Sequence, residues 1–423
     1  MRYGVRHWRW PALAETVKVP CRRPPLRLVM ASVAFALAAL AGAAAAEPGA
    51  AGGQAGRTTP VIRIGYLSQA VERPPGLSTL EVPPEDEGLQ GARLAIADNN
   101  TTGRFTGQTF ALVERVLPVD GDVAAASSSL ADDGVGYVVS TLNGAGLDRL
   151  LAVAGAGRAL VFNAGAPDDR FRRGDCRAGL LHTLPSRAML ADALAQYLIR
   201  KNWKRWFLVT GPEEGDALYA AAVRRAAGRF GGRIVAEKTW SEALDIRRTA
   251  EAEIPVFTQV ADYDILIVAD EIGFFGEYLP YRTWQPRPVA GTQGLTPVAW
   301  DRNLEQWGAR QLQSRFQRQA GRPMTAVDYA AWAAVRSIGE ATARTSSADS
   351  ATVAAYLSGD AFALAGFKGL TLSYRPWDGQ LRQPIALVTA RAVVSMSPQE
   401  GFLHPLTTLD TLGDDRAESE CKR

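Results

Sequence analysis

Short apolar runs alternate with amphipathic stretches along the chain from residue 61 to residue 292. The apolar runs are bounded by Gly, Pro, Asn or Asp, and they predict strands at 61–67, 108–116, 136–140, 159–163, 205–210, 233–240, 264–270 and 288–292. Between them, the spacing of apolar residues predicts helices at 87–100, 121–132, 146–156, 187–201, 214–229 and 246–253. This alternation predicts an α/β fold with parallel sheets flanked by helices.

The last part of the chain departs from this alternation. Two successive helices are predicted at 303–320 and 325–343, and a third, shorter one at 349–358. Two apolar stretches, 369–374 and 384–394, then predict a hairpin, because Asp378-Gly379 between them is a strong reversal signal. The final residues are polar, so we expect an irregular tail.

The amino terminus has the three parts of an export signal. Arg22, Arg23 and Arg27 precede an uncharged run, 28–46, that ends in three alanines. We therefore predict a signal peptide at 1–46 that is cleaved before Glu47, followed by a flexible lead-in at 47–60. A retained membrane anchor is the alternative, because the run is about long enough to span a bilayer.

Cleavage would change the charge and the thiol content of the chain. Residues 1–46 hold seven of the 47 basic residues and one of the 44 acidic residues, so the net charge would change from +3 to about −3. No basic patch is indicated, and nucleic acid is not an expected partner. Cys176 and Cys421 would remain, and two thiols in an oxidising compartment predict one disulfide, with two unpaired thiols as the alternative. The remaining 377 residues exceed what one core usually supports, which predicts two lobes.

Known catalytic signatures are missing from the sequence. There is no Gly-x-Ser-x-Gly elbow and no phosphate-binding loop, and the 144–146 segment lacks the third glycine of a dinucleotide site. The mature chain has only His182 and His404, too few and too isolated for a zinc site. We therefore predict a binding protein without a cofactor rather than an enzyme, although carboxylates could still support acid–base chemistry.

Four segments carry a resemblance to a known family. They are 64–68 (Ile-Gly-Tyr-Leu-Ser), 91–100 (Gly-Ala-Arg-Leu-Ala-Ile-Ala-Asp-Asn-Asn), 134–139 (Gly-Val-Gly-Tyr-Val-Val) and 367–379, with Phe-Lys-Gly at its start and Asp-Gly at its end. In order and spacing they resemble the type I periplasmic binding proteins, and within these the leucine/isoleucine/valine-binding family of ABC transporters. The resemblance covers roughly residues 60–395.

A narrower resemblance comes from the tail. The segments 401–413 and 418–421, with 175–176 and 182–190, resemble a subgroup associated with PQQ-dependent alcohol dehydrogenase systems. This implies a solute-binding role linked to periplasmic alcohol oxidation, and it leaves the solute open.

The family resemblance implies a division of the chain. Lobe 1 would combine 60–185 with 300–362, lobe 2 would combine 186–298 with 364–405, and 406–423 would be a tail. Three crossovers would fall near 184–187, 296–302 and 360–366. A monomer in the periplasm would close on a small ligand between its lobes and deliver it to an ABC permease at the inner membrane. A ligand sensor, or an accessory subunit of an alcohol dehydrogenase system, is the alternative.

The same resemblance implies site residues at the carboxyl ends of the strands. The candidates are Ser68, Gln69, Asn143, Gly144, Asn163, Ala164, Asp270, Glu271 and Gln293. Asn143 and Gly144 stand where the family usually has hydroxyl residues, and Gln293 stands where it usually has an acid. An amide cannot supply the charge that captures an ammonium group, which argues against an α-amino acid ligand.

Acidic residues gather at the predicted mouth of this site. They are Asp270-Glu271, 85–87 and Asp168-Asp169. They would suit a cationic ligand, a hydroxyl-rich ligand or a hard metal ion, but acids at helix starts are also ordinary caps. Phe274, Phe275 and Tyr278 could stack on a ligand or belong to the core.

Overall fold

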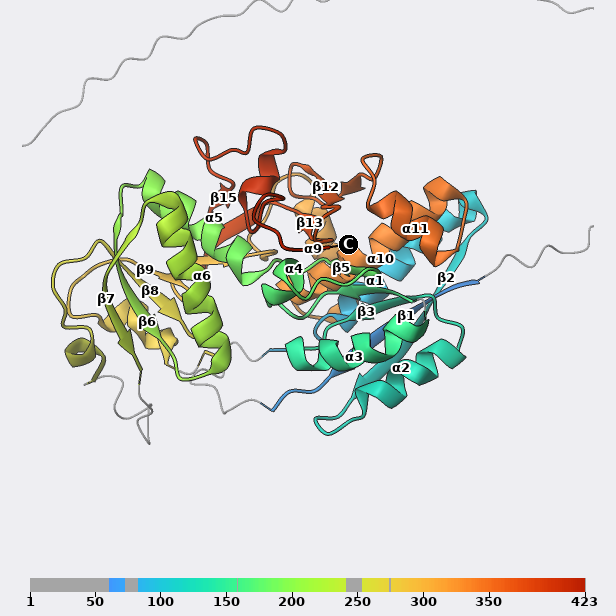
Figure 1. Ribbon diagram of the computed structural model, residues 1–423, viewed down its shortest axis with the longest axis horizontal. Helices are drawn as coiled ribbons and strands as arrows, with labels where there is room; N and C mark the ends of the chain where they lie inside the picture. Colours follow the sequence, from blue (N-terminus) through green and yellow to red (C-terminus); the bar gives the residue numbers. More distant parts are fainter. Residues whose placement is uncertain (1–60, 73–82, 158, 241–252, 274, 423) are drawn as a thin grey trace, which may run out of the picture. The chain divides into compact units, whose positions relative to one another are not determined.

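The structure is a computed structural model that describes residues 61–72, 83–157, 159–240, 253–273 and 275–422 (Figure 1). All of them belong to one structural unit, residues 58–423. The predicted signal peptide, the lead-in, Phe274 and all but the last residue of the predicted helix 246–253 lie outside the described residues. In the described part, no helix has both the length and the apolar content that a membrane span requires.

The amino-terminal part of the chain forms a parallel sheet of five strands. Its order is β2-β1-β3-β4-β5, and every neighbouring pair is parallel. The strands are β1 (Val61–Gln69), β2 (Thr109–Leu117), β3 (Tyr137–Ser140), β4 (Leu160–Asn163) and β5 (Leu180–His182). β3 and β4 are buried along their whole length, as expected for strands covered on both faces. β5 was not predicted, because three residues are too few to show a pattern.

Helices connect the strands of this first sheet. They are α1 (Leu89–Thr106), α2 (Val123–Asp132), α3 (Gly144–Gly157) and the short α4 (Arg170–Arg173). The predictions for the first three are confirmed, with α1 running six residues further than expected. It ends where Gly107 takes a left-handed conformation, with φ of 68°.

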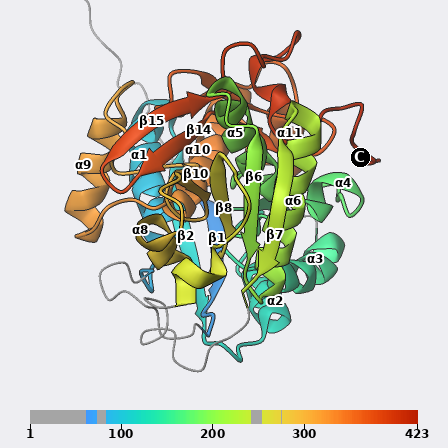
Figure 2. The same ribbon diagram turned by 90° about the vertical axis from the view of Figure 1, so that its left-hand side faces the viewer.

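A second parallel sheet follows and faces the viewer in Figure 2. Its order is β7-β6-β8-β9. The strands are β6 (Arg205–Thr210), β7 (Arg233–Thr239), β8 (Ile265–Ala269) and β9 (Val289–Gly291). Helices α5 (Arg187–Arg200) and α6 (Glu214–Phe230) contribute to one apolar cluster with β6 and β8. A short turn of helix, η1 (Gly276–Tyr278) and α8 (Leu279–Arg282), lies between β8 and β9.

Three helices late in the chain return to the first sheet. They are α9 (Ala309–Ala320), α10 (Ala326–Thr345) and α11 (Ser350–Leu357). Their apolar residues share one core cluster with β1, β3 and β4. α9 begins six residues later than predicted. Trp307 and Gly308 both have positive φ, 54° and 81°, and consecutive left-handed residues cannot be part of a right-handed helix.

The predicted hairpin of 369–374 with 384–394 is wrong in its pairing. β12 (Thr371–Tyr374) pairs with the two-residue β13 (Leu381–Arg382), and the Asp378-Gly379 turn lies between them, as predicted. The segment 384–394 divides instead into β14 (Ile385–Thr389) and β15 (Ala392–Ser397), which pair with each other. An unpredicted strand, β10 (Thr296–Val298), pairs with β14, and β11 (Leu364–Ala365) pairs with β12.

Candidate functional site

The predicted site residues lie at the carboxyl ends of strands in both parallel sheets. Ser68 and Gln69 end β1, and Asn163 ends β4. Asn143 and Gly144 stand where β3 leads into α3. From the second sheet, Asp270 and Glu271 follow β8 directly. Parallel strands present their carboxyl ends at one edge, so each sheet brings its own candidates to a common edge.

Gln69 and Asn143 line one hollow of about 170 Å³. Its remaining lining residues are Ala70, Val71, Glu72, Val119, Ala145 and Arg149. Both side-chain amides also form hydrogen bonds within the protein. Gln69 Nε2 donates to the carbonyls of Val119 and Gly121, at 2.8 and 2.9 Å. Asn143 Oδ1 accepts a hydrogen bond of 2.9 Å from the Gly146 amide and so caps the start of α3.

Asn163 and Ala164 are completely buried. Asn163 Oδ1 accepts hydrogen bonds from the amides of Gly165 and Ala166, and Nδ2 donates to the Ala166 carbonyl. Nδ2 also lies 3.0 Å from Nδ1 of His182. The side chain therefore holds the loop after β4, and in this structure it presents no polar atom to solvent. Its role as a ligand contact stays a prediction.

Ser68 and Gly144 support their surroundings in different ways. Ser68 is half-buried and forms a hydrogen bond with the hydroxyl of Tyr66. Burial raises the pKa of that Tyr66 hydroxyl to about 12. At Gly144, a Cβ atom would lie 2.6 Å from Oδ1 of Asp168, so only glycine lets this carboxylate approach the start of α3.

Asp270 is buried, and its carboxylate is used inside the protein. Oδ2 accepts hydrogen bonds from the amides of Phe275 and Gly276, at 2.9 and 2.6 Å. Phe275 is fully buried and stacks on Trp240 with ring centroids 5.3 Å apart, so it belongs to the core. Tyr278 packs against the same cluster, while Gln293 is half-buried beside Gly276.

Glu271 forms a bidentate ion pair with Arg187, a residue that we did not predict for the site. Nε and Nη2 of Arg187 donate to the two carboxylate oxygens at 2.8 and 2.7 Å. Nη1 of Arg187 lies 3.6 Å from Oδ2 of Asp168, which comes from the loop after β4. Arg187 therefore lies between a carboxylate beside the first sheet and one beside the second. We call Asp168, Arg187 and Glu271 the ion triad.

The ion triad sets the protonation of Arg187. Burial alone would lower the pKa of its guanidinium group, but the hydrogen bonds that it donates to Glu271 and the charges of Glu271, Asp168 and Asp169 raise this pKa above its ordinary value. The arginine therefore stays charged. The sequence offered one signal for it, because an arginine in the first turn of α5 opposes the helix dipole and needs a compensating acid.

A third acid lies next to the triad in the second sheet. Asp216, in the first turn of α6, is completely buried, and its Oδ1 accepts a 2.7 Å hydrogen bond from the Glu271 amide. Burial, together with the charges of Asp270 and Glu271, raises the pKa of Asp216 to about 6. Two backbone hydrogen bonds, from Glu271 and Glu213, oppose this increase.

One donor of the triad takes part in an ion pair, 3.6 Å from Oδ2 of Asp168, but makes no hydrogen bond to a described residue. Nη1 of Arg187 is buried, and no hydrogen-bond acceptor is placed for it in the described part of the chain. Unsatisfied buried donors are rare in native proteins, and they often face a ligand or water position. Nη1 of Arg187 keeps an N–H without an acceptor within the ranges that the structure describes. Among the described residues, no three His, Cys, Asp or Glu side chains are grouped so that they could hold a metal ion.

Comparisons with known proteins find a matching family model and similar structures. Residues 83–248 match the family described as periplasmic binding protein. A substrate-binding protein of an ABC transporter from Sphaerobacter thermophilus is similar in structure, with 16% sequence identity and a TM-score of 0.67 over 84% of this chain and 100% of that chain. No curated protein sequence matches the chain.

Two further solved structures are similar. One is a branched-chain amino acid ABC transporter periplasmic ligand-binding protein from Burkholderia xenovorans LB400, with 18% identity and a TM-score of 0.66 over 85% of this chain and 99% of that one. The other is the branched-chain amino acid transporter substrate-binding protein of Streptococcus pneumoniae in complex with isoleucine, with 14% identity and a TM-score of 0.60 over 80% and 99%.

These similarities establish the fold. The chain has the α/β fold of the two-lobed type I periplasmic binding proteins, with parallel-sheet lobes flanked by helices, as predicted. The three named structures are described as ligand-binding or substrate-binding proteins of ABC transporters, and that this chain is not an enzyme stays a prediction. None of the three names refers to PQQ or alcohol oxidation, so the narrower resemblance stays a prediction.

Proposed function

We propose that this protein is the periplasmic solute-binding component of an ABC transporter, and that it closes two lobes over one small molecule. The observation that carries the proposal is the ion triad. It joins a loop of the first sheet to the second sheet at strand carboxyl ends, where α/β sheets usually bind ligands. Ligand contacts made from both sides would favour the closed state by their difference in binding free energy.

We propose the lobe boundaries given by the resemblance, 60–185 with 300–362 and 186–298 with 364–405. Some contacts support this division, because α10 shares the core of the first sheet, and Ile385 and Leu387 of β14 belong to the core cluster that contains α5 and α6. By contrast, Leu364, Leu372, Tyr374 and Leu381, which the division assigns to lobe 2, lie in the core cluster of the first sheet. The chain would then cross between the lobes three times, near 184–187, 296–302 and 360–366.

We infer that the ligand is a small polar solute with a hydrogen-bond acceptor and no net positive charge. We infer the acceptor from Nη1 of Arg187, a buried N–H group that has no hydrogen-bond partner within the described residues. The charge of Glu271 is already compensated by Arg187, and Gln293 cannot bind an ammonium group as an acid would. A hydroxyl-rich compound or a carboxylic acid fits this chemistry better than a simple cation or a metal ion.

Export, partner and pathway complete the proposal. The mature protein would start at Glu47, act in the periplasm as a monomer, and meet an ABC permease at the inner membrane. Its link to PQQ-dependent alcohol oxidation rests on the tail segments 401–413 and 418–421. Mass spectrometry of the secreted protein should show a mature chain beginning at Glu47.

A ligand screen followed by one substitution tests the site. The secreted protein is screened by thermal shift with alcohols, their acid products, amino acids, PQQ and metal ions, and a compound that stabilises it is titrated by calorimetry. Arg187→Ala should weaken that compound at least tenfold, because a charged hydrogen bond contributes about 1.5–3 kcal/mol.

The matched control is Arg200→Ala at the other end of α5. Arg200 is largely exposed and pairs with the exposed Glu400, so its loss should leave the affinity unchanged. Thermal melting without ligand checks that both variants fold. If Arg187→Ala and the unaltered protein bound the compound with equal affinity, the ion triad would not be part of the binding site.

A further inference from the structure

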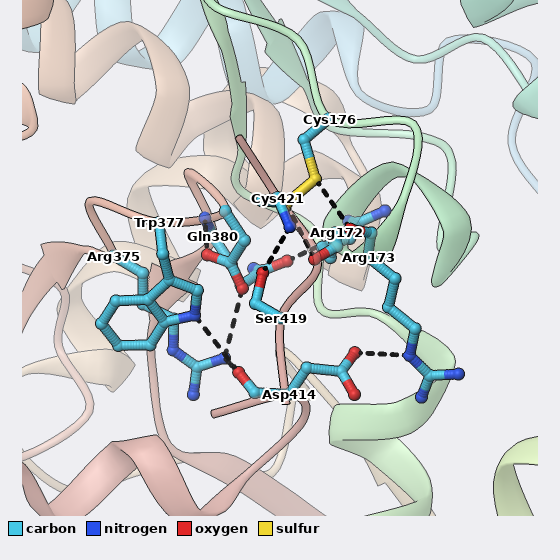
Figure 3. Close-up of a disulfide and its surroundings, with 10 residues drawn as sticks. Arg172, Arg173, Cys176, Arg375, Trp377, Gln380, Asp414, Ser419 and Cys421 are labelled. Atoms are coloured by element: carbon cyan, nitrogen blue, oxygen red, sulfur yellow. Dashed lines mark hydrogen bonds and ion pairs between the residues drawn. A yellow bond between two sulfur atoms is a disulfide. The ribbon is translucent and has the colours of Figure 1, made fainter. Parts of the chain in front are cut away.

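We propose that residues 409–421, here called the strap, join helix α4 beside the first sheet to helices α5 and α6 beside the second, and so limit how far the lobes can separate. The proposal rests on the proposed function, because a limit matters only if the lobes move. A polar, irregular tail was expected at this end of the chain, and the strap is instead attached to both sides of the molecule. Figure 3 shows its attachment beside α4.

The first half of the strap is buried. Leu412 is fully enclosed in the apolar cluster that contains α5 and α6, and Leu409, Asp410 and Asp414 are each at most 5% exposed. A free tail would not bury these positions. The charged side chains among them are matched by arginines from the rest of the protein.

The strap is attached to the second sheet through Gly413. The Gly413 amide donates a 2.8 Å hydrogen bond to Asp192 of α5, which is completely buried. The Gly413 carbonyl accepts hydrogen bonds from Arg225 and Arg229 of α6. The same two arginines lie 3.4 Å from Glu418, further along the strap.

The strap is attached to the first sheet by a covalent bond. Cys421 forms a disulfide with Cys176, which lies just after α4 in the loop between β4 and β5. Arg375, next to the β12–β13 turn, adds hydrogen bonds to Asp410 and to the carbonyls of Leu412 and Asp414.

One carboxylate connects the two attachments directly. Oδ2 of Asp414 accepts a 2.9 Å hydrogen bond from Arg173 of α4, and Oδ1 accepts one of 3.0 Å from Arg225 of α6. The side chain of Asp414 is 3% exposed, so water screens these ion pairs little. Moving α4 away from α6 would separate the charges and leave a buried carboxylate without one of its partners, which is costly.

The disulfide sets an outer limit to the same movement. Gly413 is held to α5 and α6, and eight residues later Cys421 is bonded to α4. A fully extended segment of this length spans at most about 28 Å. The Asp414 ion pairs therefore resist the first part of an opening motion, and the disulfide stops it even after they break.

Distance measurements in the ligand-free protein test the strap. Spin labels are attached through genetically encoded keto amino acids at Phe105, at the end of α1, and at Tyr281 in α8, which are 90% and 81% exposed. Pulsed electron resonance then gives the distance distribution between the two lobes. We expect a distribution that becomes broader and reaches longer distances when Asp414→Asn is combined with Cys176→Ser and Cys421→Ser.

Arg224→Gln is the matched control. Arg224 precedes Arg225 in α6 but pairs with Glu237 of β7, so its loss should leave the distribution unchanged. Thermal melting confirms that each variant folds, and the Cys176→Ser/Cys421→Ser pair alone separates the disulfide from the ion pairs. Unchanged distances in the folded triple variant would overturn the strap. If calorimetry with such a protein still detects ligand binding, the proposed function stands without it.

Discussion

Asp216, next to the ion triad, is a residue whose ionisation should change the free energy of unfolding with pH. Its pKa is raised to about 6, so the folded protein holds this proton more tightly than the unfolded chain, where the pKa of an aspartate is about 3.9. The associated stability is fully present below about pH 4 and is lost as the pH rises through 6.

Asp216→Asn should therefore become less destabilising relative to the unaltered protein as the pH rises from 4 to 7. The difference in free energy of unfolding between the two proteins should change by at most about 3 kcal/mol over this pH range, because the pKa of Asp216 is raised by roughly two units. Denaturant unfolding at several pH values measures it, with the exposed neighbour Glu214→Gln as the control. If the free energy of unfolding changed with pH in the same way for the Asp216 variant and for the unaltered protein, this carboxylate would titrate in the folded protein as it does in the unfolded chain.

The roles of several single residues in the site could not be predicted from the sequence. Asn163 and Asp270 have the residue type and the strand-end position of ligand contacts, but the structure uses both side chains to bind backbone amides. A sequence gives the position of a polar side chain relative to a strand. It does not show which local amides that side chain will satisfy. Arg187 escaped notice for the related reason that its partners are 19 and 84 residues away.

At the scale of elements, the contact between α1 and α10 depends on a glycine. A Cβ atom at Gly91 would lie 1.9 Å from the carbonyl oxygen of Asp328 and 2.9 Å from its Cα. These are backbone atoms of α10, so a rotamer change cannot relieve the overlap. The two helices approach this closely only because position 91 has no side chain.

Gly91→Ala should lower the free energy of unfolding by about 3 kcal/mol, because overpacking a rigid contact forces the backbone to move. Gly228→Ala in α6 is the control, since a Cβ atom there would meet no other atom within 4 Å. That change should stabilise the protein by up to about 1 kcal/mol, because alanine favours the helix. Equal effects of the two substitutions in denaturant unfolding would contradict the close helix contact.

The elements predicted well are those with long, regular patterns. All eight predicted strands that precede residue 293 are present, and so are the long helices. The errors fall on short or special segments. β5 and β10 have only three residues each. The sequence predicts one strand at 384–394 because the turn between β14 and β15, at residues 390–391, contains no Gly, Asn or Pro.

At the scale of the whole molecule, the strap and the ion triad act on the same movement, and both oppose separation of the lobes. The triad lies at strand ends, where a ligand would draw the sheets together, and the strap resists their separation. Neither could be derived from local sequence. Each joins residues distant in the chain, and only the disulfide between Cys176 and Cys421, 245 positions apart, was predicted, from the number of cysteines.

Small-angle scattering tests the central claim, closure over a ligand, most directly. The secreted protein is measured alone and with a saturating amount of a compound that stabilises it in the thermal-shift screen. We expect a smaller radius of gyration in the presence of the compound, and the unliganded profile again after its removal. Superimposable profiles at saturation would contradict a protein that works by clamping its lobes on a solute.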